Sequence, residues 1–187
     1  MESDTNPIIA ELQMFTMLPM AEHQKRYYNQ MLADAKPVQC TPLAELFSKE
    51  ELAEIRRVIR PRKHQCYNNA LKFAESLPDM IKYVEGFGWN GLCKVEHAFN
   101  RIGNVYVDIT WDMVLGHDVT KEAYVSLIED NAENVLRNVA EYDNITGDYY
   151  RRKYIESLGG IHEVGKMLDD QAVKALNKKD GTVSDAI

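Results

Sequence analysis

The sequence predicts a single α+β domain, because a central stretch with the two-residue period of strands lies between two regions of helical spacing. The 187 residues are 45% hydrophobic, which is enough to bury one core. No internal repeat, low-complexity block or linker divides the chain. We therefore expect one domain over residues 1–187: a helical region (1–60), a core of one helix and a sheet (61–116), a second helical region (117–180) and a frayed tail (181–187).

The first region contains two helices with recognisable ends. The stretch AEHQKRYYNQMLADA (21–35) has no helix breaker until Pro37. Ser48 and Glu51 form an S-x-x-E capping box in front of LAEIRRVI, and Pro61 stops that helix. Both segments are therefore predicted as helices that precede the core.

A third helix begins close to Cys66, where QCYNNA leads into ALKFAESL. Its apolar residues Ala70, Phe73 and Leu77 recur at helical spacing, and Pro78 closes it. The unpaired N–H groups and the dipole at a helix N-terminus favour negative charge, which lowers the pKa of a thiol placed there. The position predicts a reactive thiolate at Cys66.

The three cysteines form no C-x-x-C pair and are odd in number. This pattern argues against a disulfide framework or a structural zinc site, and it favours a reducing, cytoplasmic location. We expect Cys40 and Cys93 to be small buried side chains. The N-terminus MESDTNPIIAELQMFTML lacks the positive charge of a signal peptide, and no apolar run reaches about 18 residues, so we expect neither export nor a membrane span.

From residue 81 the pattern changes to that of strands. Three stretches are predicted to form a small antiparallel sheet: IKYVEGF (81–87), LCKVEHAFNRI (92–102) and NVYVDITW (104–111). Gly103 and Asn104 supply a two-residue turn between the last two.

This turn sets the register of the predicted hairpin. Paired residue numbers should sum to about 207, which places His97 opposite position 110 and on the same face as Asp108. We expect a partly polar crevice on that face, with the start of the Cys66 helix across it.

Beyond Gly116 the sequence returns to helical spacing. We expect helices in KEAYVSLIEDNAENVLRNVAEY (121–142), in DYYRRKYIESL (148–158), which Gly159-Gly160 closes, and in HEVGKMLDDQAVKALNKK (162–179).

Cys66, His97 and Asp108 are the residue types of a thiol nucleophile, its imidazole base and the group that orients the base. His64 is an alternative base on the segment before the helix. The non-catalytic alternatives are a buried thiol, a structural histidine, and an aspartate that caps a turn or pairs with Arg101.

The blocks CYNNA, YVEGF, VEHAF and VDITW resemble the cysteine, histidine and aspartate blocks of transglutaminase-like and papain-like cysteine enzymes, including small uncharacterised bacterial and phage members. The resemblance covers residues 62–112. It implies a papain-like or transglutaminase-like core in which the cysteine opens a helix packed on an antiparallel sheet. It also implies that Cys66 is the nucleophile, His97 the general base and acid, and Asp108 the orienting group.

Some positions depart from the pattern of that superfamily. Phe99 stands where tryptophan is frequent, and Ile109 stands where proline is frequent. Gln65 adjoins Cys66, whereas papain-like enzymes place a glutamine several residues earlier for the oxyanion hole. The candidate oxyanion donors are therefore the backbone N–H of Cys66 with Gln65 or Asn68.

These features predict a cysteine acyl-transfer enzyme that acts on an amide or similar carbonyl through an acyl-Cys66 intermediate. Peptidase, amidase, deamidase and transglutaminase chemistry all fit, on a peptide, protein or small amide substrate and without a cofactor. The alternative is a non-catalytic intracellular binding or inhibitor protein, phage-encoded, that uses the same fold to engage a host protein.

Other stretches give weaker alternatives. The formal net charge of −7 makes nucleic acid a poor default partner, although RRVIRPRKH and DYYRRKY keep a nucleotide-binding module as a third interpretation. Asp112, His117 and Asp118 match no metal-binding spacing, so we expect no metal site. Glu85 and Glu96 form a carboxylate pair on adjacent predicted strands, the residue types that glycoside hydrolysis uses.

Overall fold

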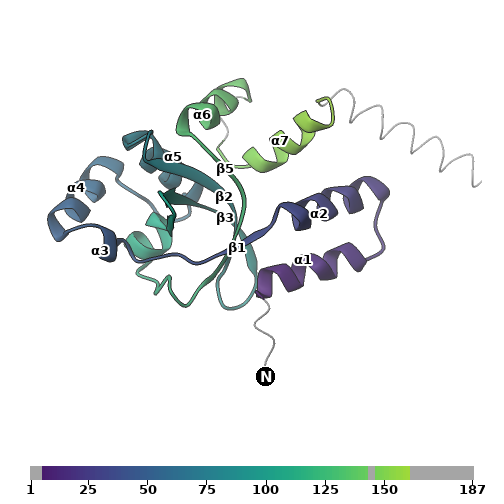
Figure 1. The fold of residues 1–187 in the computed structure, drawn as a ribbon, viewed down its shortest axis with the longest axis horizontal. Coiled ribbons are helices and arrows are strands. Elements are labelled where there is room, and N and C mark those ends of the chain that lie inside the picture. Colours follow the sequence, from purple (N-terminus) through teal and green to yellow (C-terminus); the bar gives the residue numbers. More distant parts are fainter. Residues whose placement is uncertain (1–5, 143–145, 161–187) are drawn as a thin grey trace, which may run out of the picture. The chain divides into compact units, whose positions relative to one another are not determined.

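The computed structural model describes residues 6–142 and 146–160. The chain forms two compact units, Met1–Tyr150 and Arg151–Ile187. The first unit contains the sheet and all the candidate site residues (Figure 1). In the described part of the second unit, residues 151–157 belong to helix α7 (Tyr149–Ser157), and just beyond it the N–H of Gly160 donates to the carbonyl of Ile155. The expected helix at 162–179 and the tail lie outside the described residues.

The first unit is built on a five-stranded antiparallel sheet, which confirms the α+β class. The strand order is β1-β5-β2-β3-β4. Cys40, just beyond β1, forms a parallel bridge with Tyr106 of β4, so the sheet curls until its two edges meet. The strands are β1 (Lys36–Val38), β2 (Ile81–Trp89), β3 (Lys94–Ile102), β4 (Val105–Val107) and β5 (Ala123–Asp130).

Helices cover the outside of this sheet. The predicted capping box is present, because Ser48 accepts from the N–H of Glu51 and Glu51 accepts from the N–H of Ser48. Asn6 caps the first helix in a related way by accepting from Ile8. The helices of the first unit are α1 (Pro7–Met17), α2 (Glu22–Asp34), α3 (Leu43–Leu46), α4 (Lys49–Ile59), α5 (Cys66–Ser76) and α6 (Ala132–Glu141).

The core has an inner part and two outer parts. Helices α5 and α6 pack on the outer face of the sheet, and the α1–α2 hairpin packs beside them on β2 and β5 (Figure 1). The inner cluster lies inside the curl of the sheet and consists of Cys40, Val84, Phe99, Trp111, Val119 and Tyr124.

The predicted hairpin has the expected register. Asn100 pairs with Val107 and Ile102 pairs with Val105, so the pairs sum to 207 as predicted. The strand predicted for 104–111 is wrong beyond Val107. Asp108 caps a π-helix, η1 (Ile109–Leu115), because its carboxylate binds the N–H groups of the following residues.

The helix predicted for 121–142 is wrong in its first half, where the structure has strand β5. This strand lies between β1 and β2, and residues 124–126 are buried, so both of its faces are covered there. Tyr124 points into the inner cluster and Val125 into the α1–α2 cluster, so the strand lacks the apolar-polar alternation of an exposed one. Strand β1 was not predicted either. It is a three-residue edge strand that contains Pro37.

A close approach between β2 and β5 requires a glycine at position 86. The register between these strands shifts between Glu85 and Gly86. A Cβ at position 86 would lie 2.0 Å from the carbonyl oxygen of Val125, so only glycine fits there.

Candidate active site

Cys66 is the first residue of α5, as predicted, and Gln65 is its N-cap. The thiol is half-buried and lies beside β3, where the backbone N–H groups of Ala98 and Tyr67 donate toward the sulfur. Strand β4 ends at Val107, before it would reach the stretch of β3 at His97 and Ala98. This early end of β4 leaves the edge of β3 open to the thiol.

His97 is the imidazole next to Cys66. It lies on β3 and is only 2% exposed. Its Nε2 is 2.6 Å from Oδ2 of Asp108, and the ring also hydrogen-bonds the Cys66 thiol. Because Nε2 is occupied by the carboxylate, Nδ1 is the nitrogen that remains for the sulfur.

Asp108 is fully buried, and both of its oxygens are used. Oδ2 faces His97 and accepts from the hydroxyl of Tyr124 at 3.1 Å. Oδ1 accepts from the N–H groups of Thr110 at 2.9 Å and Trp111 at 3.0 Å. Four donors thus hold a carboxylate that would be costly to bury alone. The same contacts fix the direction in which it receives the imidazole.

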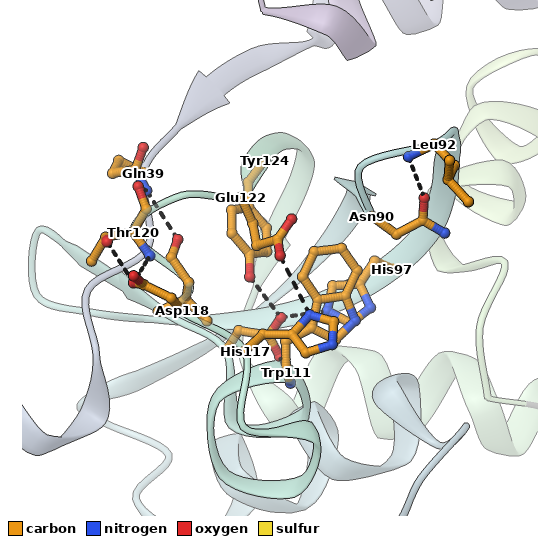
Figure 2. A network of polar contacts seen from close by, with 12 residues as sticks. Gln39, Asn90, Leu92, His97, Trp111, His117, Asp118, Thr120, Glu122 and Tyr124 are labelled. Carbon is orange, nitrogen blue, oxygen red and sulfur yellow. Dashed lines mark hydrogen bonds and ion pairs between the residues drawn. The ribbon is translucent and has the colours of Figure 1, made fainter.

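Trp111 covers the ring of His97. The two rings stack with centroids 4.5 Å apart, and Figure 2 shows them together with Tyr124. His117 lies next to Trp111, with ring centroids 5.6 Å apart, and its Nδ1 is 3.4 Å from Glu122. The indole therefore shields the His97–Asp108 hydrogen bond from water, which strengthens that bond.

The electrostatics favour a thiolate and an imidazolium. Burial raises the pKa of the Cys66 thiol, but the hydrogen bond and charge of His97 and the two backbone N–H donors outweigh it, so the pKa is lowered. Burial lowers the pKa of His97, but the charge and hydrogen bond of Asp108, assisted by Cys66, raise it to about 10. Each group therefore stabilises the charged form of the other.

The other cysteines behave differently. Cys40 is buried, as predicted, and burial together with the charge of Asp108 raises the pKa of its thiol. The prediction that Cys93 is buried is wrong: it is exposed at the turn between β2 and β3, where Asn90 accepts from its N–H. The thiol of Cys66 thus has a lowered pKa and an imidazole partner, whereas the pKa of the Cys40 thiol is raised.

The remaining predicted site residues lie around the start of α5. Gln65 is exposed and directly precedes Cys66, and Asn68 is half-buried in the first turn of α5. His64 is exposed, with a left-handed backbone, and the imidazole at the sulfur is that of His97 instead. The backbone N–H of Cys66 lies in the first turn of its helix, where N–H groups have no partner within the helix.

Asn69 is a buried residue that sequence reasoning missed. Its side chain binds both the N–H of Arg62 (3.0 Å) and the carbonyl of Arg62 (2.7 Å). It also donates to the hydroxyl of Thr110 at 3.1 Å. Asn69 thus ties the loop before Cys66 to the helix after Asp108. Nothing in the letters YNNA distinguishes it from its neighbour.

Tyr124 and Trp111 were also missed as parts of the site. Trp111 lies within the resemblance, but it was predicted as the end of a strand, and Tyr124 was predicted within a helix. An aspartate before a segment that can form a helix is a known N-cap signal, and at Asp108 this signal could have placed Trp111 correctly.

A buried carboxylate lies next to Ala98, on the neighbouring strand β2. Glu85 of β2 pairs with Ala98 and is 5% exposed. It accepts from the hydroxyl of Tyr83 at 3.1 Å and from the N–H of Tyr149 at 3.0 Å. Glu96, its predicted partner, is exposed. Burial, and then the charges of these two carboxylates, raise the pKa of Tyr67 beside the thiol.

Two of the residues considered as metal ligands from the sequence, Asp112 and Asp118, have other partners. Asp112 accepts from the N–H of Leu43 at 2.6 Å, and Asp118 pairs with Lys121 at 2.8 Å. Within the described ranges, no group of three or more histidine, cysteine or acidic side chains could hold a metal ion.

Comparison with protein-family models, curated proteins and solved structures gave no match for this chain. None of the described helices combines the length and apolar composition that a bilayer crossing requires. The geometry around Cys66 is therefore the basis for a functional proposal.

Proposed function

We propose that this protein is a cysteine-dependent acyl-transfer enzyme that attacks an amide or similar carbonyl. The observation that carries the proposal is the line of contacts from Asp108 through His97 to the thiol at the start of α5. A lowered thiol pKa, a raised imidazole pKa and a buried, fully bonded carboxylate are what nucleophilic catalysis by cysteine requires. The order of these three residues also agrees with the papain-like or transglutaminase-like core that the resemblance implies.

The reaction would proceed in two steps. The Cys66 thiolate attacks the carbonyl carbon and forms a C–S bond, and the His97 imidazolium gives its proton to the leaving amine as the C–N bond breaks. His97 then takes a proton from water or from an acceptor amine, which attacks the acyl-Cys66 thioester and releases the thiolate. Asp108 keeps the imidazole in one orientation throughout.

The developing oxyanion needs donors close to the sulfur. The backbone N–H of Cys66 is the first candidate, because it lies at the helix N-terminus and points out of the helix. The side chains of Gln65 and Asn68 are the candidate second donors. The substrate class stays peptide, protein or small amide, with water or an amine as acceptor.

An activated ester tests this proposal without knowledge of the substrate. We expect p-nitrophenyl acetate to give a burst of p-nitrophenolate close to one equivalent of enzyme, and peptide mass spectrometry to find the acetyl group on Cys66. The matched control is Cys93→Ser, which removes an exposed thiol outside the site and should retain the burst. Cys66→Ser should lose it.

Acetylation of Cys40 or Cys93 at the same rate as Cys66 would contradict the proposal. So would a Cys66 acetylation rate that is unchanged in His97→Ala. Either result would favour the non-catalytic binding protein that the sequence also allowed.

A further inference from the structure

The sheet contains a second polar region at the other end of its inner face. A hollow of about 440 Å³ is lined by Lys36, Lys82, Arg101, Ser126, Glu129 and Asp130, with two apolar neighbours on β5. Arg101 lies four residues from His97 on the same face of β3, a separation of about 13 Å along the strand. The hollow is thus distinct from the contacts around Cys66.

We propose that this hollow binds a small molecule through a phosphate group. The proposal is independent of the function proposed for Cys66. It depends on the placement of three cations, on the engagement of the two carboxylates that could neutralise them, and on the size of the space.

The cations come from three strands. Lys82 of β2 and Arg101 of β3 are direct partners in the register, so their side chains leave the same face next to each other. Like charges that are directly opposite in a sheet repel. Lys36 of β1 pairs with Ser126 of β5 and adds a third positive charge. A bound anion would interact favourably with these positive charges.

Glu129 is already used by other groups. One of its oxygens is 2.5 Å from Nε of Arg101, and the other accepts from the hydroxyls of Tyr106 at 2.6 Å and Ser126 at 3.3 Å. Burial raises the pKa of this carboxyl, but the three donors outweigh it and lower the pKa. Glu129 therefore neutralises Arg101 and has no further charge to offer the lysines.

The carboxylate of Asp130 is bound by residues at the start of α6 and at the start of α7. Its Oδ1 accepts from Asn131 and Asn134, each at 2.7 Å, and its Oδ2 accepts from the hydroxyl of Tyr149 at 2.6 Å. Lys82 donates to the side chain of Asn131, a neutral group. Within the described part of the chain, neither Lys36 nor Lys82 forms an ion pair with a carboxylate.

The side chains that line the hollow therefore carry a net positive charge, three cations against two carboxylates, in a protein whose formal net charge is −7. Lysine binds phosphate as a compact point charge, and both Lys36 and Lys82 line the hollow. The volume lies at the lower end of the range for small-molecule sites, roughly 300–1,000 Å³. It leaves room for a small organic part beside the phosphate.

Calorimetry with inorganic phosphate, on the full chain at low ionic strength, tests the proposal. We expect saturable binding by the wild type. Lys36→Gln/Lys82→Gln should weaken it by about tenfold or more, because two charge-assisted contacts are lost. The matched control is Lys25→Gln/Lys49→Gln, which removes the same charge from exposed positions on α2 and α4 and should bind as the wild type does.

Three outcomes would overturn the proposal. The first is no saturable heat with phosphate, and the second is equal weakening in both double variants, which would indicate a general charge effect. The third is tighter binding of citrate than of phosphate with the same dependence on the two lysines, which would assign the hollow to a carboxylate ligand instead. Circular dichroism melting of both variants shows that they are folded.

Discussion

Gly88 of β2 and Trp111 of η1 are in such close contact that no side chain fits between them. A Cβ at position 88 would lie 2.4 Å from the indole. The same indole stacks on the ring of His97, at a centroid distance of 4.5 Å. A glycine on one strand therefore sets how closely the tryptophan can cover the histidine of the next strand.

Gly88→Ala should accordingly affect both stability and the site. The added methyl group must push the indole away, and we expect the free energy of unfolding to fall by about 1–3 kcal/mol, the usual cost of overpacking. Urea unfolding gives this value. Gly91→Ala is the control for stability alone: nothing lies within 4 Å of its Cβ, although its positive φ brings a separate backbone cost.

If Gly88→Ala unfolds like the wild type and acetylates Cys66 at the same rate, then contact with Trp111 does not position His97. A loss of acetylation larger than that in Gly91→Ala, at a pH where both are folded, would support the positioning role.

The alkylation of Cys66 by iodoacetamide should depend on pH in a defined direction. Because the pKa of Cys66 is lowered, its thiolate persists below the ordinary thiol pKa of about 8.5, and its alkylation should persist with it. In His97→Ala the hydrogen bond and charge that oppose burial are gone, so the midpoint should move upward. Peptide mass spectrometry separates the rates of the three cysteines.

Cys93 reports reagent access in the same experiment, because its thiol is exposed and outside the site. Cys40 should react slowly, since burial and Asp108 raise the pKa of its thiol. A Cys66 midpoint that is identical with and without His97 would contradict the thiolate–imidazolium pair.

Asp108→Asn should preserve the shape of the buried carboxylate and remove its charge. The charge and hydrogen bond of Asp108 are what raise the pKa of His97, so that pKa should fall and the Cys66 alkylation midpoint should rise. We expect acetyl turnover to drop by about a hundredfold or more, as when a general base is misdirected. The pH profile distinguishes this effect from unfolding, which would expose all three thiols equally.

Tyr124→Phe should have a smaller effect in the same direction. It removes one of the four donors to Asp108 and leaves the ring in the inner cluster. We expect a loss of about 1 kcal/mol in the free energy of unfolding, the typical net value of one hydrogen bond, and a modest upward shift of the Cys66 midpoint.

Tyr28→Phe is the matched control for this variant, because the Tyr28 ring stacks on Phe15 at 5.4 Å and lies on α2, away from the site. A shift of the Cys66 midpoint as large in Tyr28→Phe as in Tyr124→Phe would show that the hydroxyl on Asp108 has no specific role.

The parts of the fold that local signals control could be predicted. The capping box at Ser48 and the turn at Gly103 each use residues within a few positions of each other. The capping box predicts the correct helix start, and the turn predicts the correct register. With that register, the sequence alone predicts that His97 and Asp108 share one face of the hairpin. Their contact at 2.6 Å follows from a pairing that begins several residues away.

The rest of the fold depends on contacts that are distant in the sequence. Strand β5 is covered on both faces at Tyr124 and Val125 by residues from distant parts of the chain, so its own letters do not alternate there. Tyr124 on that strand reaches Asp108 only because the sheet curls. Asn69 forms hydrogen bonds with Arg62 in the loop before α5 and with Thr110 in η1. No local sequence pattern predicts these contacts.

The bridge between Cys40 and Tyr106 also bears on how copies of the protein behave toward each other. An open sheet offers its outer strands as templates for another chain, which is a common route to aggregation. Here both outer strands are three residues long, one contains Pro37, and the two are joined at Cys40 and Tyr106. Strand addition by a second copy therefore has little free backbone to start from at β1 and β4, and at the open edge of β3 the sulfur of Cys66 already accepts from the N–H of Ala98.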